Sequence, residues 1–342
     1  MVFDIPIVSD LLFYPLKRDA EKVYSLTSGV IGTSDEYRDR PFLNQKRDVL
    51  KETVYVGNEI SVFDREAEQH ADEVQKEEGT FWVTYAGTIG TSYDIRTMVL
   101  AAEELMKQGK TKIRFQILGD GPTREMLENL AKERKIQNVK FTGYVPYEQM
   151  AAYLVKSDVL INSFVRKAPQ SIVTKIGDYL AAGKPMINTC MSPEFRKKVE
   201  QDGFGINIEP EDVRELVNAV EWMYENEAER NDMGNRARKI AEEQFDRPVS
   251  YGKIEAMISS LITKRSKGRI KMRPVFSVVM PTYGVEKYIE KAIRSVQAQT
   301  FENWELLVID DCTCDQKCRN CLRNCKNRFS YPHRTSRNKP GA

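Results

Sequence analysis

Hydrophobic and polar positions alternate in a regular way between residues 81 and 262. Short apolar runs are each followed by a longer segment whose apolar residues recur at helical spacing, which predicts buried strands alternating with helices. The strands are expected at residues 82–86, 113–118, 139–142, 159–162, 186–189 and 204–208. Since this alternation is typical of a parallel sheet with helices on both faces, the sequence predicts an α/β fold with a Rossmann-like, doubly wound parallel sheet.

The stretch from Asp158 to Met191 places polar groups at the carboxyl end of one of these strands. Pro169 interrupts the backbone after the strand, and a helix with an apolar stripe is expected from Ser171 to a C-terminal glycine, Gly183. Open α/β sheets bind ligands at the carboxyl ends of their strands, and the first turn of a helix offers N–H groups. The sequence therefore predicts a phosphate-binding loop here.

The segments before and after this alternation differ from it. Short strands are expected at 29–34 and 54–57, and the polar run 64–80 indicates a solvated helix or linker. Residues 263–274, with six basic residues in twelve, are typical of a linker, and contact with acidic lipid headgroups is the alternative. A new strand, helix and strand are then expected at 275–280, 286–299 and 304–309.

Composition narrows the functional class only slightly. The 342 residues favour about two domains, and 52 basic against 50 acidic residues give no reason to expect nucleic acid as a partner. No apolar run approaches the ~20 residues that span a bilayer, and the N-terminus lacks the basic start of a signal peptide. The sequence thus predicts a cytoplasmic protein, with peripheral contact at the inner membrane face left open through the basic linker.

The cysteines are unevenly distributed. Cys190 follows an expected core strand and is predicted to be a buried small apolar residue. The other five cysteines lie in the last thirty-one residues. Two interpretations of this C-terminal stretch stay open, a zinc site and an out-of-frame end. Neither is strong enough for a metal site to be predicted. The zinc interpretation depends on the ligand-like spacing of Cys318 and Cys321, with further candidates at Cys312, Cys314, Cys325 and His333.

The segment APQSIVTKIGDYLAAGKPMI (168–187) resembles the E-x7-E region of the glycosyl transferases group 1, retaining enzymes of GT-B fold. In that family the second acidic residue holds the ribose hydroxyls of a sugar nucleotide, and the first touches the donor sugar. The resemblance puts Asp178 and Gln170 at these positions, so this chain carries Q-x7-D. A solvated helix position is the alternative for Asp178, and a plain loop position is the alternative for Gln170.

Three other loops, AGTIGTSYD, ILGDGP and FTGYVPYEQM, resemble the remaining donor-site loops of the same family, in the family's order. Glycines there let the backbone approach a diphosphate, and the residues after the third loop's glycine line the nucleobase pocket. The donor-binding residues that the resemblance implies are Gly87, Thr88, Gly90, Gly119, Gly121, Tyr144, Val145, Ser171, Ile172, Thr174 and Asp178.

The chain departs from the family in its cations. Many relatives carry a basic pair after the first loop, where this chain has Thr91 and Ser92, with Arg96 near. Lys175 is the best remaining cation, and we expect it and the helix N-termini to stabilise the departing diphosphate. Lys175 and Gln170 are therefore the candidate catalytic residues. The alternative for Lys175 is a structural lysine that snorkels over its helix.

Residues 276–311, FSVVMPTYGVEKYIEKAIRSVQAQTFENWELLVIDD, resemble the opening of the family-two glycosyltransferases of GT-A fold. The resemblance implies nucleotide contacts from Thr282, Tyr283, Asp310 and Asp311. It stops soon after, so this part is expected to be a βαβ fragment without catalysis. SLTSGVIGTSDEY and VYVGNEISVFD resemble the last strands of the N-terminal GT-B domain and its exit.

The expected domains follow from these resemblances. They are a remnant of the GT-B N-terminal domain (1–76), a GT-B C-terminal nucleotide-sugar-binding domain (77–262), a basic linker (263–274), a truncated GT-A start (275–315) and a disordered cysteine-rich tail (316–342).

The resemblance implies a glycosyltransferase that moves a sugar from a nucleoside-diphosphate sugar to a glycan or lipid-linked acceptor in cell-surface polysaccharide synthesis. It implies no cofactor beyond that donor substrate and no metal. Because both transferase domains are expected to be incomplete, we expect donor binding with little transfer. Two alternatives stay open, a non-catalytic nucleotide-sugar-binding remnant and a GT-B epimerase that acts on the nucleotide sugar.

Overall fold

The computed structural model describes residues 6–42, 48–168, 172–266, 276–282, 291, 294–296, 298 and 304–310. Residues 1–261 form one compact unit, and residues 262–342 form a second. The two units are described separately below.

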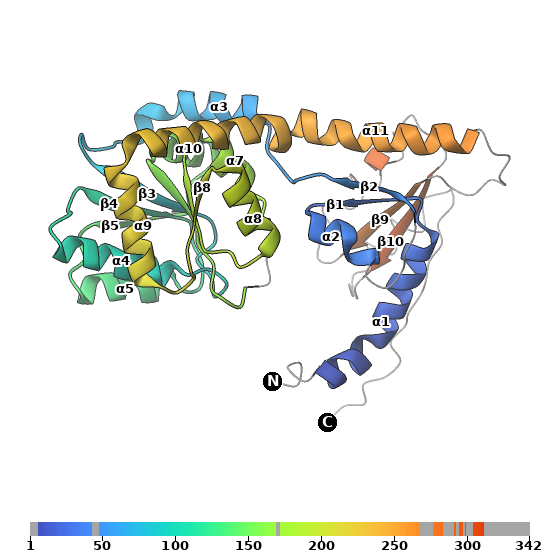
Figure 1. The fold of residues 1–342 in the computed structure, drawn as a ribbon, viewed down its shortest axis with the longest axis horizontal. Coiled ribbons are helices and arrows are strands. Elements are labelled where there is room, and N and C mark those ends of the chain that lie inside the picture. Colours follow the sequence, from blue (N-terminus) through green and yellow to red (C-terminus); the bar gives the residue numbers. More distant parts are fainter. Residues whose placement is uncertain are drawn as a thin grey trace. The chain divides into compact units, whose positions relative to one another are not determined.

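A six-stranded parallel sheet is the centre of the first unit (Figure 1). Its strand order is β5-β4-β3-β6-β7-β8, so the chain first builds outward from β3 and then returns to add β6 on the other side of β3. This reversal is a topological switch point, where ligands bind in open α/β sheets. The strands are β3 (Phe81–Ala86), β4 (Ile113–Leu118), β5 (Val139–Gly143), β6 (Val159–Asn162), β7 (Met186–Asn188) and β8 (Gly205–Asn207).

Helices cover both faces of this sheet (Figure 1), which confirms the predicted doubly wound α/β fold. Neighbouring strand residues point to opposite faces, so Tyr85 joins the core with α4 and α9 while Ala86 joins the core with α6, α7 and α10. The helices are α4 (Ile95–Lys107), α5 (Arg124–Glu133), α6 (Tyr147–Lys156), α7 (Lys175–Ala181), α8 (Pro193–Asp202), α9 (Val213–Glu225), α10 (Glu227–Ile240) and α11 (Arg247–Ser266), with a π-helical turn at Ala241–Phe245.

Local chemistry sets where several of these helices begin and end. The Asp94 carboxylate accepts a hydrogen bond from the Thr97 backbone at the start of α4, and Asp212 does the same for Glu215 at the start of α9. Gly183, after α7, has a φ of 63°, as expected for a glycine that ends a helix. The last helix, expected at 250–263, is longer than predicted and includes the first residues of the predicted linker.

Helix α3 (Ile60–Gln69) includes the start of the run 64–80, which was predicted to be a solvated helix or linker and of which only Ala67 and Val74 are buried. One face of α3 packs into the core, where Phe63 is fully buried and contributes about 2 kcal/mol of burial free energy. Ile60 and Ala67 lie on the same face at helical spacing. The apolar stripe begins before the polar run, so the run alone did not reveal it. A short 3-10 turn, η3 (Ala71–Glu73), follows.

The N-terminal part of this unit holds a small parallel pair of strands, β1 (Gly29–Gly32) and β2 (Leu50–Thr53). The strand predicted at 29–34 is present as β1. The strand predicted at 54–57 is wrong, because the segment that pairs with β1 is the preceding one, β2. A Cβ on Gly57 would lie 1.5 Å from the Phe245 carbonyl oxygen, so this segment is packed against the end of the π-helical turn instead of a strand. The accompanying helices are α1 (Pro6–Leu26), α2 (Asp35–Asp39) and η2 (Arg40–Phe42).

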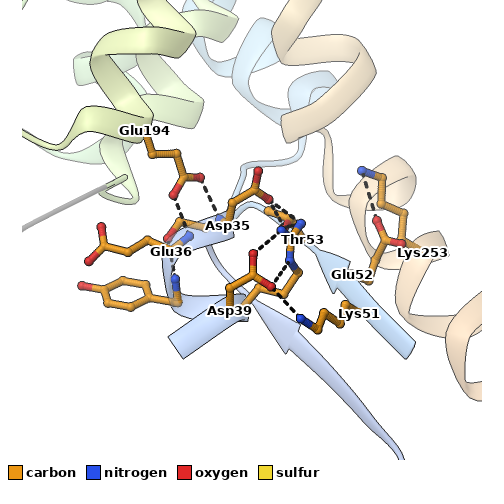
Figure 2. Close-up of polar contacts among 11 residues, drawn as sticks. Asp35, Glu36, Asp39, Lys51, Glu52, Thr53, Glu194 and Lys253 are labelled. Carbon is orange, nitrogen blue, oxygen red and sulfur yellow. Dashed lines mark hydrogen bonds and ion pairs between the residues drawn. The ribbon is translucent and has the colours of Figure 1, made fainter. Parts of the chain in front are cut away.

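A set of charged groups, here called the α2 cluster, surrounds α2 (Figure 2). Glu194 of α8 accepts hydrogen bonds from the backbone N–H groups of Asp35 and Glu36, at 2.7 and 2.8 Å. The Arg38 guanidinium pairs with Asp39 at 2.6 Å, and the Lys51 ammonium lies 3.1 Å from the same carboxylate. These charges are therefore matched within the cluster.

The second unit contains a parallel pair, β9 (Phe276–Thr282) and β10 (Trp304–Asp310). These strands were both predicted. Thr282 and Asp310 are partners at the carboxyl ends of the pair. Most of the helix expected at 286–299 lies outside the described residues, of which residues 291 and 294–296 are helical.

Candidate functional site

The loops that follow β3, β4 and β5 meet at the carboxyl edge of the sheet. The Gly119 N–H donates to the Gly143 carbonyl at 2.8 Å, and the Gly87 N–H donates to the Leu118 carbonyl at 3.0 Å. A Cβ on Gly119, which has a φ of 130°, would lie 1.9 Å from the Gly87 carbonyl oxygen. Glycine is therefore required for this close approach, and the three predicted loops form one continuous surface.

Helix α7 is attached to the same edge. The Tyr179 hydroxyl accepts a hydrogen bond from the Ala86 N–H at 2.7 Å and donates to the Ala86 carbonyl at 3.1 Å, which ties α7 to the end of β3. The helix begins at Lys175, one turn later than the predicted start at Ser171. Ile172 packs against the core before the helix begins.

A ladder of buried asparagines holds the ends of the neighbouring strands. The Asn162 amide donates to the Asn188 side-chain oxygen at 2.9 Å, and the Asn188 amide donates to Asn207 at 2.8 Å. The Phe164 N–H donates to the Thr189 hydroxyl at 2.6 Å. These bonds position the loop after β6, including the ring of Phe164, beside α7.

The ammonium group of Lys175 lies in a cage of aromatic rings, the Lys175 cage. Its Nζ lies 4.3, 4.7, 5.4 and 5.6 Å from the ring centres of Tyr85, Tyr93, Phe164 and Tyr179. Nζ is buried and has no hydrogen-bond partner in the part of the chain that the structure describes. Burial lowers the pKa of Lys175 to about 7, because removal from water disfavours the charged amine. The Lys175 side chain also contacts the position of Gly87, in the first loop.

The carboxylate of Asp178 lies one turn further along α7, in a small pocket. Its Oδ1 accepts hydrogen bonds from the Asn58 amide at 2.9 Å and from the Tyr147 hydroxyl at 3.0 Å. Burial raises the pKa of Asp178, and the two hydrogen bonds oppose that shift only in part. The pocket, here called the α7 pocket, has a volume of about 260 Å³ and is lined by Val56, Gly57, Asn58, Glu59, Val62, Tyr147, Thr174, Asp178 and Arg247.

Four polar residues of this pocket were missed at the level of sequence, namely Asn58, Glu59, Tyr147 and Arg247. Tyr147 follows the third predicted loop directly, so its position in FTGYVPYEQM could have indicated it. Asn58 and Arg247 belong to the two segments that cross beside α7, where the Arg247 N–H donates to the Asn58 carbonyl at 2.9 Å. Nothing in the sequence links these segments to Asp178, which lies 120 positions after Asn58.

The other predicted donor-binding residues are distributed along this edge. Thr88 and Thr174 are exposed, Gly90 is half-buried, and the Thr88 carbonyl accepts a hydrogen bond from Tyr85 at 2.7 Å. The side chain of Tyr144 is 78% exposed, whereas Val145 packs against the core. Gln170 and Ser171 lie outside the described residues, as do Tyr283 and Asp311. Arg96 lines a different pocket, of about 580 Å³, beside α5. No residue of α7 lines that pocket.

The described residues contain neither a metal-binding cluster nor a membrane-spanning helix. Histidine, cysteine, aspartate and glutamate side chains do not gather there in any group of three or more that could hold a metal ion. No helix in the described ranges combines the length and apolar character needed to cross a membrane. The cysteines of the proposed zinc interpretation lie outside these ranges.

The strand order, the glycine loops and the pocket at one edge define a Rossmann-like α/β domain of GT-B type. Comparison with protein families matches residues 66–240, just over half of the chain, to the Glycosyl transferases group 1, and the chain belongs to this family. Residues 277–342 match Glycosyl transferase family 2. Both resemblances predicted from the sequence are thus confirmed.

Individual relatives are similar over limited stretches. WcaI of Escherichia coli, named as a glycosyl transferase assigned to colanic acid biosynthesis, is 26% identical over 141 residues, 40% of this chain and 34% of WcaI. WfgD of Escherichia coli, named UDP-Glc:alpha-D-GlcNAc-diphosphoundecaprenol beta-1,3-glucosyltransferase, is 51% identical over 39 residues, 11% of this chain and 15% of WfgD. The chain therefore spans about a third of WcaI, and less of WfgD.

A solved structure shares the fold over a longer stretch. HepE of Anabaena in complex with UDP superimposes with a TM-score of 0.61 at 17% identity, covering 72% of this chain and 67% of HepE. The same protein has also been solved with UDP-glucose. At this identity the likeness establishes the shared fold.

Proposed function

We propose that this protein binds a nucleoside-diphosphate sugar at the carboxyl edge of its six-stranded sheet, as the donor-binding part of a glycosyltransferase. The observation that carries the proposal is α7, which holds an unpartnered buried amine, Lys175, and a half-buried carboxylate, Asp178, one turn apart. An amine is suited to a diphosphate, and a carboxylate is suited to the hydroxyls of ribose. UDP and UDP-glucose in the HepE structures agree with this class of ligand.

The proposed roles follow from where each group lies. The diphosphate would approach the first loop at Gly87, where the backbone carries no side chain and the Lys175 stem is in contact. Its negative charge would favour the protonated form of Lys175, which would then stabilise charge on the departing nucleotide. Asp178 would bind the ribose, and Gln170 stays the candidate for contact with the donor sugar.

The remaining parts of the proposed function concern the acceptor and the location. A glycan or lipid-linked acceptor in polysaccharide synthesis is consistent with the names of WcaI and WfgD. A cytoplasmic location, with the basic stretch 263–274 at an anionic membrane surface, remains a prediction. Cosedimentation with vesicles rich in anionic lipid tests the membrane contact, which is contradicted if neutral vesicles bind equally well.

Calorimetric titration of the purified protein with UDP, GDP and ADP tests the donor site. We expect saturable binding of at least one nucleotide, and binding about a hundredfold weaker in the Asp178→Ala variant. Absence of binding for all three nucleotides would contradict the proposal.

A second candidate, a nucleotide-sugar-binding protein that performs no transfer, is favoured by Gln170, an uncharged residue at the family's first acidic position. Release of UDP from UDP-sugars in the presence of lipid-linked or glycan acceptors separates the two candidates. Binding without release favours this second candidate.

A further inference from the structure

The side chain of Asn58 has an unmet hydrogen bond in the wall of the α7 pocket. Asn58 is 7% exposed, and its Nδ2 donates to Asp178 Oδ1 at 2.9 Å. Its Oδ1 is buried and has no hydrogen-bond partner among the described residues. A buried acceptor without a donor destabilises the folded protein, so a ligand hydroxyl placed here would be favoured.

The orientation of this amide follows from its neighbour. If the amide were turned over, its oxygen would face the Asp178 carboxylate oxygen, and two acceptors would be in contact. The observed arrangement satisfies Asp178 and leaves the Asn58 oxygen for another donor. Both hydrogen bonds of Asp178 are made by Oδ1, so Oδ2 is a second acceptor that the described residues do not use.

The backbone around Asn58 is held on several sides. The Asn58 carbonyl accepts from the Arg247 N–H at 2.9 Å, and the Ile60 N–H donates to the Asp246 carboxylate at 3.2 Å. A Cβ on Gly57 would lie 1.5 Å from the Phe245 backbone, and a Cβ on Gly177 would lie 3.1 Å from the Gly57 backbone. The backbone segments around these residues therefore pack closely. The Asn58 side chain is thus presented to the pocket by a fixed backbone.

The size of the pocket limits what it holds. Its volume of about 260 Å³ is below the ~300–1,000 Å³ of pockets that hold whole small-molecule ligands. One five-membered sugar ring with two hydroxyls fits this volume and matches two acceptors, Asp178 Oδ2 and Asn58 Oδ1. The nucleobase and the diphosphate would then extend beyond the pocket.

We propose that Asn58 is a ribose-binding residue and that it shares the two ribose hydroxyls of the donor with Asp178. One hydroxyl donates to Asp178 and the other to Asn58. This makes the site selective for ribonucleotides over deoxyribonucleotides. The inference rests on the proposed donor site and adds to it a residue from the segment that leads into α3.

Titration calorimetry with UDP, 2′-deoxy-UDP and 3′-deoxy-UDP tests this division of the hydroxyls. We expect the wild-type protein to bind each deoxy analogue about tenfold more weakly than UDP, since one hydrogen bond is lost in each. In Asn58→Ala, UDP binding should weaken about tenfold, and the preference against one deoxy analogue should vanish while the other persists. Asp178→Ala should remove the preference against the other deoxy analogue. Asn129→Ala, an exposed asparagine of α5, is the matched control.

The outcomes distinguish this inference from the proposed function. If the wild-type protein binds no nucleotide, both are overturned. If it binds UDP and both deoxy analogues with equal affinity, the inference alone is overturned, and this result needs no variant. An equal loss for all three nucleotides in Asn58→Ala also overturns it. Asn58→Leu, which keeps the branched shape of the side chain, repeats the measurement if the alanine variant unfolds.

Discussion

The α7 pocket and the α2 cluster both contain carboxylates, but their surroundings differ. Asp39, in the α2 cluster, is exposed and lies against Arg38 and Lys51, and the Arg38 hydrogen bond lowers its pKa to about 2. Asp178 is half-buried and accepts hydrogen bonds from two neutral donors, with Arg247 in the same pocket, and burial raises its pKa. A carboxylate that forms ion pairs with cations has its charge already satisfied. A half-buried carboxylate whose hydrogen-bond donors are neutral keeps acceptor capacity for a ligand, which is what a binding site needs.

The cations of the two regions differ in the same way. Arg38 pairs with Asp35 and Asp39, and hydrogen bonding to Asp39 raises its pKa. Lys175 has ring faces around its Nζ and a pKa lowered to about 7. Under the proposed function α7 is the functional element, and we expect the α2 cluster to be structural. The following predictions test that difference.

Removal of the two carboxylates should have very different effects on nucleotide binding. We expect Asp178→Ala to weaken UDP binding about a hundredfold, because a charged acceptor contributes roughly 1.5–3 kcal/mol per hydrogen bond. Asp39→Ala should leave UDP binding unchanged. Calorimetry on the two variants measures both effects, and equal losses would remove the distinction between the two regions.

The affinity for UDP should depend on pH through Lys175. The amine must be charged to stabilise a diphosphate, and with a pKa of about 7 it loses its proton as the pH rises above that value. We therefore expect the affinity to fall by up to about tenfold per pH unit between pH 7.5 and 9. Lys175→Met should bind UDP weakly and without this pH dependence. A flat profile for the wild-type protein would mean that Lys175 does not contact the diphosphate as an ammonium.

Removal of the two cations should change stability in opposite directions. Lys175→Met removes a buried, unpaired amine, and we expect the free energy of unfolding at pH 7 to rise by about 1 kcal/mol or more. Arg38→Met breaks ion pairs, and we expect a decrease of about 1 kcal/mol. Urea denaturation of both variants measures these changes.

The stability gained in Lys175→Met should also change with pH. A lysine pKa lowered from 10.5 to about 7 means that the folded protein binds fewer protons than the unfolded chain between these values. The stability of the wild-type protein therefore rises with pH across this window, and the advantage of Lys175→Met shrinks. A constant difference between pH 7 and 10 would contradict burial of the amine.

The smallest effect is expected in the α2 cluster at low pH. Because the folded pKa of Asp39 is lowered from 3.8 to about 2, its contribution is present above pH 3.8 and is lost as the pH falls through about 2. The pair is exposed, so we expect Asp39→Asn to cost about 0.5 kcal/mol at pH 7. Urea denaturation at pH 7 and pH 2.5 should show this difference shrinking.

Much of the fold could be predicted because its signals are local. The β3 run is buried at all six positions. The ends of the six sheet strands agree with the predicted ends within one or two positions. The errors have a common cause. The strand expected at 54–57 was judged from its own residues, whereas packing against Phe245 decides its structure, and the start of α3 before residue 64 was missed because its buried face lies outside the polar run.

The site was predicted only in part. Family resemblance indicated Lys175 and Asp178, and the glycine loops indicated the edge of the sheet where they lie. Neither the ring cage around Lys175 nor the contact of Asn58 with Asp178 could be predicted from the sequence. The rings come from three separate segments, and Asn58 and Asp178 are 120 positions apart.

The sequence by itself determined the alternation of strands and helices, the glycines at the strand ends and the family, since each depends on short-range patterns. The tertiary structure alone decided which polar atoms are buried and which of them are left without a partner. Burial and hydrogen bonding depend on the groups that folding brings together, and here the strand order that returns to β3 brings α7 beside the segment of Asn58.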